Sequence, residues 1–308
     1  MRRGGQTTPI AKPITSHKEY YVKLFVSQGM REHLSAILLG LKPAAIMRIS
    51  LLSDTHHNFG DSSEWPYPLP DHDILVLAGD ISEYVDSPAN LTEVLAHYRS
   101  RTDQPILYLP GNHEFYRHDY HRALGWIRRD TDQFGIEFLN CRCIQYGDVA
   151  FHGCTLWSDF TLFGVKQADL YGIYAEESVS DFYVIGFENR AFRRTDCANL
   201  HRKERTWLEE SLASSNAPYN VVITHFAPVS QCIAARYQGD RLNPYFVAGC
   251  EDLAERFEPD LWLYGHTHQP DDFILGKTRF INNARGYPLE KSETDFRPDK
   301  IIEVGEKI

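Results

Sequence analysis

The chain has 308 residues, of which 43% are hydrophobic and 24% are charged, an ordinary composition for a globular protein with a sizeable core. Its formal net charge of −10 disfavours a general binder of nucleic acids or anionic membranes, whose affinity rests on clustered Lys and Arg, although it leaves room for a local basic groove. The six cysteines contain no C-x-x-C pair, which favours a reducing, cytoplasmic location. Cys141 and Cys143 are interpreted as strand residues rather than as thiolate metal ligands.

The N-terminal segment differs in charge from the rest of the chain. Residues 1–45 carry seven Lys and Arg against two Glu, a net charge of +5. Their best apolar stretch, Leu34–Leu41, is far shorter than the ~20 residues of a membrane span, so no transmembrane helix is predicted. The first strand opens directly at Met47. We predict that residues 1–46 are a flexible extension and that 47–308 form the domain, with an organelle transit peptide as the alternative for the basic leader.

From Met47 onward, strand-length apolar runs alternate with helical patterns, which favours an α/β fold in a single domain. Caps and apolar periodicity predict four helices: one that opens at Ser87-Pro88 and runs to about Tyr98, one over 120–135, one over 194–213, and one over 243–257. A solvated face is expected for the charged residues of the second helix, Arg122, Arg128, Arg129 and Asp130. Two paired strands are expected over 138–143 and 148–155.

Residues 155–187 are unusually aromatic, with eight Trp, Phe and Tyr. Aromatic side chains are commonly part of a core, so packing of a sheet edge and a loop is the favoured interpretation. The alternative is that these side chains form the wall of a pocket.

Five short apolar runs end in residues that could bind a metal ion. The runs and the residues that follow them are Ile49–Ser53 with Asp54 and His56, Ile74–Ala78 with Asp80, Ile106–Leu109 with Asn112 and His113, Val221–Thr224 with His225, and Leu261–Tyr264 with His266 and His268. Any one of these strand ends alone is weak evidence for a metal site, because a polar turn after a strand is common. Ligands of open α/β sheets bind at the carboxyl ends of the strands, so the repetition predicts one shared site.

The donors at these strand ends are two carboxylates, one amide oxygen and four imidazoles, from Asp54, Asp80, Asn112, His56, His225, His266 and His268. Nitrogen and oxygen donors without thiolates suit Mn, Fe or Zn, and the set is too rich in imidazole for Mg or Ca. Seven donors exceed the need of one tetrahedral ion. Two ions that share a carboxylate would use them all and leave positions open for water and substrate.

The motifs D-x-H, G-D, G-N-H-E, H and G-H-x-H, in this order, resemble those of the calcineurin-like metallophosphoesterase superfamily. The resemblance runs from about Met47 to the end of the chain. It implies a four-layer αββα sandwich with two central mixed β-sheets and a dimetal site at the carboxyl ends of the strands. By motif position, one metal would be bound by Asp54, His56, Asp80 and His268, and the other by Asp80, Asn112, His225 and His266. Asp80 would bridge the two.

Three further stretches, Gly111–Tyr116, Thr155–Trp157 and Ala284–Tyr287, look like a bacterial branch of predicted phosphoesterases within this superfamily. That branch often carries N-P-R-G-Y and a second histidine, where this chain has Ala284 and Phe226. Neither position is a metal ligand in the general pattern. The departures therefore concern substrate preference rather than activity.

The resemblance also implies a mechanism. Two metals ~3.5–4 Å apart can bind a bridging hydroxide as nucleophile and neutralise charge on the phosphoryl oxygens. His113 resembles the family's substrate-facing histidine, whose help as a general acid is typically worth ~10²–10⁴ in rate. Glu114, Arg285 and His152 are candidates for supporting the ligands or contacting substrate. His57 has no role in the motif.

The resemblance implies a metal-dependent phosphoric ester hydrolase that acts on a small-molecule phosphoester. A phosphodiester is favoured, because an exposed dimetal site readily accepts diesters as well as monoesters. The alternatives are a nucleotide pyrophosphatase, a phosphomonoesterase or a nuclease on the same site, and a metal-binding scaffold without turnover. The net negative charge of the chain disfavours a nuclease that acts on double-stranded nucleic acid. The oligomeric state is left open.

Overall fold

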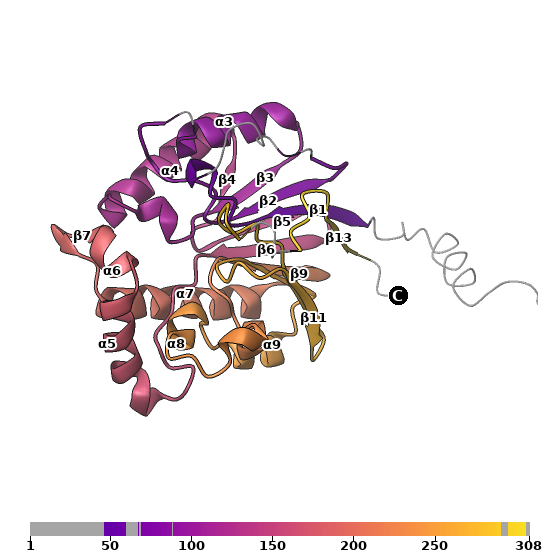
Figure 1. Cartoon of the computed structure of the whole chain (residues 1–308). Helices are drawn as coiled ribbons and strands as arrows, with labels where there is room; N and C mark the ends of the chain where they lie inside the picture. Colours follow the sequence, from indigo (N-terminus) through magenta and orange to yellow (C-terminus); the bar gives the residue numbers. More distant parts are fainter. Residues whose placement is uncertain (1–45, 60–66, 68, 88, 291–294, 306–308) are drawn as a thin grey trace, which may run out of the picture. The chain divides into compact units, whose positions relative to one another are not determined.

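The computed structural model describes residues 46–59, 67, 69–87, 89–290 and 295–305. The extension predicted over residues 1–46 lies almost wholly outside the described residues. Figure 1 shows two β-sheets stacked on each other, with helices on both outer sides.

The first sheet has five strands in the order β13-β1-β2-β3-β4. They are β1 (Met47–Leu52), β2 (Ile74–Ala78), β3 (Ile106–Leu109), β4 (Glu137–Phe138) and β13 (Ile301–Val304). The strands β1 to β4 run parallel, and β13 pairs with β1 in the antiparallel sense. Every residue of β2 and β3 is buried, as expected of apolar runs in a parallel sheet covered on both faces.

The second sheet has six strands in the order β11-β12-β10-β9-β6-β5. They are β5 (Arg142–Tyr146), β6 (Val149–Cys154), β9 (Tyr219–Thr224), β10 (Leu261–Tyr264), β11 (Asp271–Leu275) and β12 (Thr278–Asn282). The four inner strands are parallel, and the edge strands β5 and β11 are antiparallel to their neighbours. The prediction of two central mixed sheets is therefore confirmed.

An apolar layer fills the space between the sheets. Alternate residues of both sheets meet there, among them Leu51 and Val76 from the first sheet and Phe151, Ile223 and Leu263 from the second. All five are essentially inaccessible to water. Full burial of one such side chain is worth ~1.5–3 kcal/mol, so this layer holds the two sheets, and the strand ends that they carry, in fixed register.

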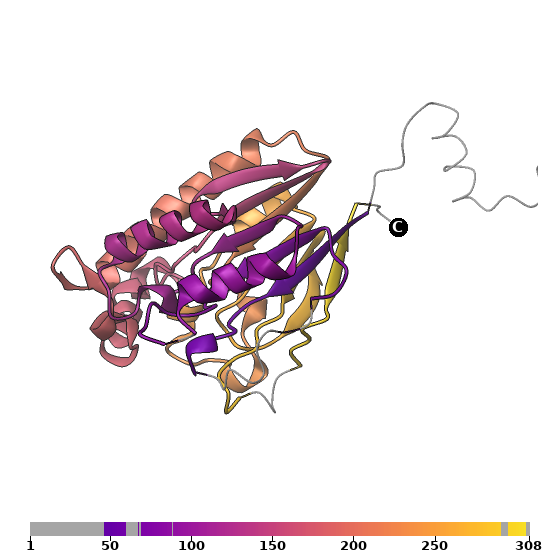
Figure 2. The ribbon, with the colours of Figure 1, turned by 90° about the horizontal axis from the view of Figure 1, so that it is seen from above.

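Four helices form the outer layers. They are α3 (Leu91–Arg101), α4 (Tyr120–Phe134), α7 (Arg194–Ser214) and α9 (Glu251–Phe257). The first two cover the outer face of the first sheet, and α7 and α9 cover that of the second, which Figure 2 shows from above. The four-layer prediction is confirmed. No helix within the described part of the chain is long and apolar enough to cross a bilayer.

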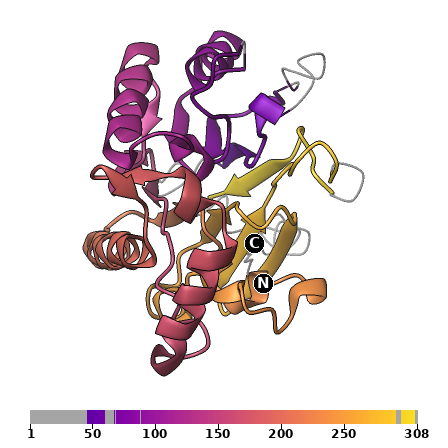
Figure 3. The ribbon, with the colours of Figure 1, turned by 60° about the vertical axis from the view of Figure 1, so that its left-hand side comes forward.

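A further group of short elements lies at one end of the sandwich (Figures 1 and 3). It comprises α5 (Ala168–Ser178), α6 (Asp181–Val184), the hairpin β7 (Gly186–Phe187) and β8 (Arg190–Ala191), and α8 (Asn243–Phe246). Helix α5 packs against α8 although they are far apart in sequence. Of the eight aromatic residues of 155–187, three are buried in the core (Trp157, Phe160 and Phe182), two pack against it (Tyr171 and Phe187), and three are exposed (Phe163, Tyr174 and Tyr183). The core interpretation describes this stretch better than the pocket wall.

Two predicted helices have different ends in the structure. Helix α3 begins at Leu91 rather than at Ser87-Pro88, because the side chain of Asn90 accepts the backbone N–H of Thr92 and caps it. The helix predicted over 243–257 is interrupted between α8 and α9. The backbone N–H groups of Ala248 and Cys250 there bond to the loop after β9 instead of to the preceding turn.

The strand predicted over 138–143 is divided between the sheets. Phe138 ends β4 in the first sheet, and β5 begins at Arg142 in the second. Cys141 has a φ of 50° at the crossing, which an extended strand cannot adopt. Asp130 of α4 is buried rather than solvated, because its carboxylate accepts hydrogen bonds from Tyr84.

Candidate metal centre

The loops after the parallel strands are tied together by backbone hydrogen bonds. The N–H of Asp54 donates to Gly79 O and that of His56 to Asp80 O, both at 3.0 Å. Five of the seven predicted ligands have left-handed backbone, namely Asp54, His56, Asp80, His266 and His268. This conformation costs a residue with a side chain roughly 1–2 kcal/mol. Strain of this kind persists where surrounding contacts hold it, and here it turns five donors toward one point.

The first donor group contains Asp54, His56, Asp80 and His268, whose ligand atoms all lie within 4.8 Å of one another. The Nε2 atoms of His56 and His268 are 3.1 Å apart. His268 Nε2 is 3.4 Å from Asp54 Oδ1, and His56 Nε2 is 3.7 Å from Asp80 Oδ2.

The second donor group contains Asp80, His225 and His266. His225 Nε2 lies 3.5 Å from Asp80 Oδ1 and 3.2 Å from Asn112 Oδ1. His266 Nε2 is buried and has no hydrogen-bond partner among the described residues. Asp80 is common to both groups, with one carboxylate oxygen toward each.

The contacts of His225 and Asn112 show that this site fits a cation. His225 Nδ1 is 3.0 Å from the carbonyl oxygen of Ala78, which can only accept, so Nδ1 carries the proton. Asn112 donates its amide N–H to Asp181 at 3.0 Å, which turns its oxygen toward His225. Two acceptors thus face each other in the neutral state, and a metal ion between them satisfies both.

His268 shows the same arrangement on the other side. Its Nδ1 lies 2.7 Å from the carboxylate of Glu290, which fixes the ring and leaves Nε2 directed at Asp54 and His56. A carboxylate behind a ligand histidine is the common means of setting its tautomer. The sequence analysis did not identify Glu290.

The protonation of the histidines follows from burial and from Asp80. Burial lowers the pKa of His56 and His266 well below the ordinary value, which keeps both imidazoles neutral, as metal ligands must be. For His225, burial opposes protonation, but the charge of Asp80 outweighs it and raises the pKa to about 9. Asp54 and Glu290 likewise raise the pKa of His268 to about 10 against the effect of burial. Protons thus compete with a cation at these two ligands.

Glycines let the backbone approach the ligands closely. A Cβ on Gly79 would lie 2.5 Å from His225 Nδ1, and one on Gly111 or Gly265 would collide with the carboxylate of Asp80 or Asp54. No larger residue fits there without displacing a ligand.

A pocket of about 440 Å³ opens beside this cluster. The candidate ligands Asp80, Asn112, His266 and His268 are among the residues that line it, together with His113. The site is therefore accessible to a small molecule, as a substrate site must be.

A sequence model of the calcineurin-like phosphoesterases matches residues 47–270. The chain belongs to the calcineurin-like phosphoesterase family. An uncharacterized protein of Acanthamoeba polyphaga mimivirus is 25% identical over an alignment of 284 positions that covers 82% of this chain and 95% of that protein. Phosphopantetheinyl hydrolase from Mycobacterium tuberculosis has a similar fold, with a TM-score of 0.67 and 18% identity over 83% of this chain and 95% of the hydrolase.

Members of the calcineurin-like phosphoesterase family use divalent metals, and the two donor groups are the candidate sites in this one. The structure brings together all seven residues selected from the sequence. Phe226, at the position of the branch's second histidine, packs its ring on His266 with centroids 4.0 Å apart. It thereby covers one side of a candidate ligand with apolar surface.

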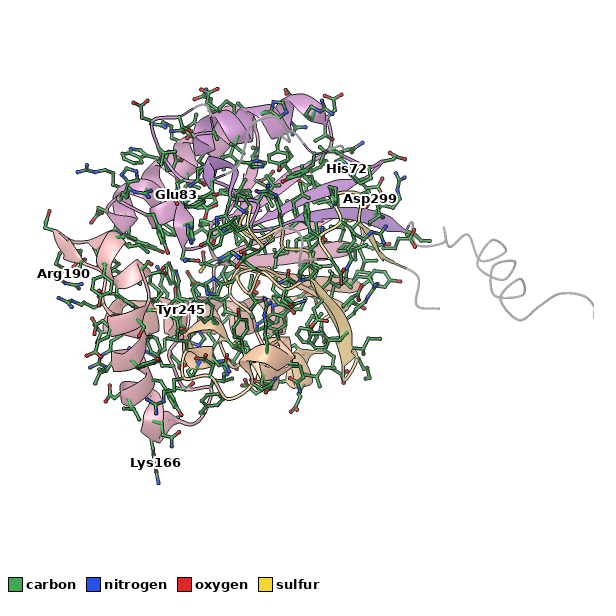
Figure 4. All side chains as sticks on the ribbon, viewed as in Figure 1. His72, Glu83, Lys166, Arg190, Tyr245 and Asp299 are labelled. Atoms are coloured by element: carbon green, nitrogen blue, oxygen red, sulfur yellow. The ribbon has the colours of Figure 1, made fainter. Side chains whose placement is uncertain are left out.

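His113 of this phosphoesterase lies at the pocket between Glu83, which the sequence analysis did not identify, and Tyr287, which ends the stretch Ala284–Tyr287 noted there. Its Nδ1 is 3.2 Å from Glu83, and its Nε2 is 2.9 Å from the hydroxyl of Tyr287. Burial opposes protonation, but Asp80 and Glu83 raise the pKa of His113 above its ordinary value. Figure 4 places Glu83 in the interior, and Arg117 pairs with its second oxygen.

Glu114 supports the loops rather than a ligand side chain. Its carboxylate accepts backbone N–H groups of Asp80, Ile81 and Gly111 at 2.8–3.0 Å, which ties two ligand loops together. Burial and the nearby charge of Asp80 raise the pKa of Glu114 to about 8.

The two remaining candidates lie in different places. Arg285 is buried and donates to the carbonyl oxygen of Thr55, between two ligands. His152 points away from the cluster, because on β6 it alternates with Phe151 and contacts Ser211 of α7 and Asn220 instead. The structure does not bring His152 to the site.

Asp181 is a further contributor without a sequence signal. It is fully buried at the start of α6 and accepts hydrogen bonds from Asn112, from Tyr116 at 2.7 Å, and from Tyr245. Figure 4 shows Tyr245 inside the fold, well away from exposed positions such as Lys166. The ligand Asn112 is thus oriented from α6.

Proposed function

We propose that this protein is a dinuclear metal-dependent phosphoesterase that hydrolyses a small-molecule phosphodiester. The observation that carries the proposal is the pair of donor groups that share Asp80, in each of which the possible ligand atoms lie within 4.8 Å of one another. One ion would be held by Asp54, His56, Asp80 and His268, and the other by Asp80, Asn112, His225 and His266. Mn, Fe and Zn suit these donors.

Bound ions would supply Lewis-acid charge at the phosphoryl oxygens and activate a water for attack on phosphorus. The chain itself supplies the proton for the departing oxygen. His113 faces the pocket, and Glu83 behind it favours the protonated ring, as a general acid requires. The hydroxyl of Tyr287, 2.9 Å from the other ring nitrogen, Nε2, keeps the imidazole turned toward the pocket.

The charge of the pocket supports a diester over a monoester. Among its described lining residues, Arg236 is the only Lys or Arg, whereas Asp80, Asp181, Asp240 and Glu290 are acidic. A phosphomonoester carries close to two negative charges at neutral pH and a diester carries one. Because the diester carries the smaller charge, its binding needs fewer Lys or Arg side chains in addition to the metal ions.

Metal analysis and a substrate panel test the proposal. The protein reconstituted with Mn, Fe or Zn should hold two ions per chain and hydrolyse bis(4-nitrophenyl) phosphate faster than 4-nitrophenyl phosphate, with full loss on chelation. A phosphopantetheinyl ester belongs in the panel because of the solved hydrolase of similar fold. Less than one bound ion would contradict the dimetal site. Faster turnover of the monoester or of a dinucleotide pyrophosphate would favour those alternatives, and two ions without turnover would favour a scaffold.

A further inference from the structure

The pocket extends well beyond the candidate metal ligands. Candidate ligands form one part of its lining, and the other part comes from the segment 178–181, between α5 and α6, and from the segment 232–247, which includes α8 and whose Phe246 ring lies 4.9 Å from the ring of His266. These segments lie outside the two sheets, at the end of the sandwich where Figure 3 shows α5 and α6. Its volume of about 440 Å³ falls within the ~300–1,000 Å³ typical of small-molecule sites. A phosphate group alone would leave most of it unfilled.

The part of the lining that the segments 178–181 and 232–247 supply includes an apolar wall. Val179, Ile233, Leu242 and Phe246 all line it. Each is only half-buried, and each packs against the main hydrophobic core with the rest of its surface. This apolar surface is held in place by the core and is open to the pocket. Displacement of water from it by a ligand lowers the free energy and therefore favours binding.

The charged groups around this wall are occupied by neighbours. Arg236 lies over the ring of Tyr237, with its guanidinium carbon 4.9 Å from the ring centre. Asp240 accepts the backbone N–H of Leu242 at 2.8 Å, and Glu290 binds His268. Of the charged side chains that the segments 178–181 and 232–247 add to the described lining, two are acidic, Asp181 and Asp240, and one is basic, Arg236, so a second anionic group would meet no excess of positive charge there.

We infer that this pocket binds an uncharged, largely apolar substituent of the phosphoester substrate, with Ile233, Leu242 and Phe246 as its specificity-determining residues. This rests on the proposed function, because the phosphoryl group is placed at the candidate metal ligands. The substrate class is then a phosphodiester with one apolar arm, which excludes nucleoside polyphosphates and polynucleotides as preferred substrates.

Binding of phosphonate monoesters tests the inference without turnover. The dissociation constants of methyl, butyl, hexyl and 3-carboxypropyl methylphosphonate are measured by calorimetry on the metal-reconstituted protein. Each of these ligands has only one ester arm, so no second ester group can occupy the pocket in its place. Affinity should rise by up to ~4-fold per methylene, the equivalent of ~0.8 kcal/mol per buried CH₂. The carboxypropyl ligand should bind at least ~10-fold more weakly than butyl, because its charge is buried among acids.

Three variants test whether the effect of alkyl length on affinity arises at Ile233. Ile233→Lys should abolish the gain with chain length and favour the carboxypropyl ligand, whereas Ile233→Met should behave as the unmodified protein. Ile274→Lys makes the same substitution on β11, where the side chain is 71% exposed and outside the pocket, and should change nothing.

The two proposals fail in different ways. Equal affinity for all alkyl ligands, or identical behaviour of Ile233→Lys and Ile274→Lys, overturns the apolar pocket even if diesters are hydrolysed. A rise in affinity with alkyl length that depends on Ile233 supports the pocket even if no ester is hydrolysed, and in that case the proposed function alone is contradicted.

Discussion

Asp181 accepts the side-chain N–H of Asn112 at 3.0 Å and thereby decides which atom of Asn112 faces His225. An asparagine amide can turn either its oxygen or its nitrogen to a neighbour, and only the oxygen can bind a metal. The orientation of a candidate ligand therefore depends on a carboxylate 69 residues away in sequence.

Asp181→Ala should weaken binding of one of two metal ions by ~10–100-fold, the usual effect of removing a group that orients a ligand. The amide of Asn112 would then be able to turn over. Asp181→Asn should retain most of the affinity, because its side-chain oxygen can still accept from Asn112. Metal titration by calorimetry measures the change, and Asp169→Ala, on the exposed side of α5, is the control. Unchanged affinity in Asp181→Ala would contradict the orienting role.

His113→Ala should keep both metal ions and lower kcat by ~10²–10⁴ with an alkoxide leaving group. The loss should be smaller with 4-nitrophenolate, which needs little protonation as it departs. Steady-state kinetics with both kinds of ester, together with metal analysis, measure the difference. Asp80→Asn is the contrasting variant and should lose one or both ions with its shared charge. Equal losses of kcat for both leaving groups would contradict the general-acid role and leave only a positioning role for His113. Loss of metal from His113→Ala would contradict its assignment as a residue that faces the substrate.

Metal affinity should increase with pH. Without metal, the pKa values of His225 and His268 are raised to about 9 and about 10, so both rings are protonated at pH 7 and must release protons to bind. The apparent binding constant should rise by ~10-fold per pH unit for each proton displaced, and the rise should level off above pH 10. Calorimetry in buffers of different ionisation enthalpy counts the protons. Binding without proton release would show that these histidines are neutral or are not ligands.

Glu204 should make stability depend on pH. Burial raises its pKa from 4.5 to about 8, although Leu156 N–H donates to its carboxylate. A raised pKa means that the folded state binds the proton more tightly, so this stabilisation is complete below pH 4.5 and is lost as pH rises through 8. Between pH 5 and 9 the unmodified protein should therefore lose stability relative to Glu204→Gln, as measured by the free energy of unfolding in denaturant. Glu210→Gln, exposed on the same helix, is the control. Parallel curves for all three proteins would contradict the shift.

A protein that starts at Met47 should fold and hydrolyse phosphodiesters as well as the full chain. The reason is that the match to the family begins at residue 47, where β1 opens. Solubility, thermal unfolding and kcat/KM of the two forms measure this. Insolubility or loss of activity would make the extension part of the fold. A targeting role would instead appear as a change of location in cells, with activity unchanged.

Local patterns in the sequence were enough to predict the strands and to select the candidate ligands. The runs 74–78, 106–109 and 261–264 coincide with β2, β3 and β10, because a short apolar run flanked by turn residues is a property of neighbouring positions. Residues that follow the runs of one sheet then had to meet, since the carboxyl ends of parallel strands share one edge, and the stacking of the two sheets brings the two edges together. Motif order added the assignment of those residues to two groups, which the structure also gathers around Asp80.

What only the tertiary structure decided is which distant side chains support and surround the ligands. Glu83, Asp181 and Glu290 have no fixed spacing from the residues that they contact, so no periodicity reveals them. His152 was a candidate by residue type, but the two-residue alternation of β6 turns it toward α7. The pocket likewise depends on α5, α6 and α8, which meet across the chain. Strand formation is set by neighbours in sequence, whereas these contacts are set by how the layers pack.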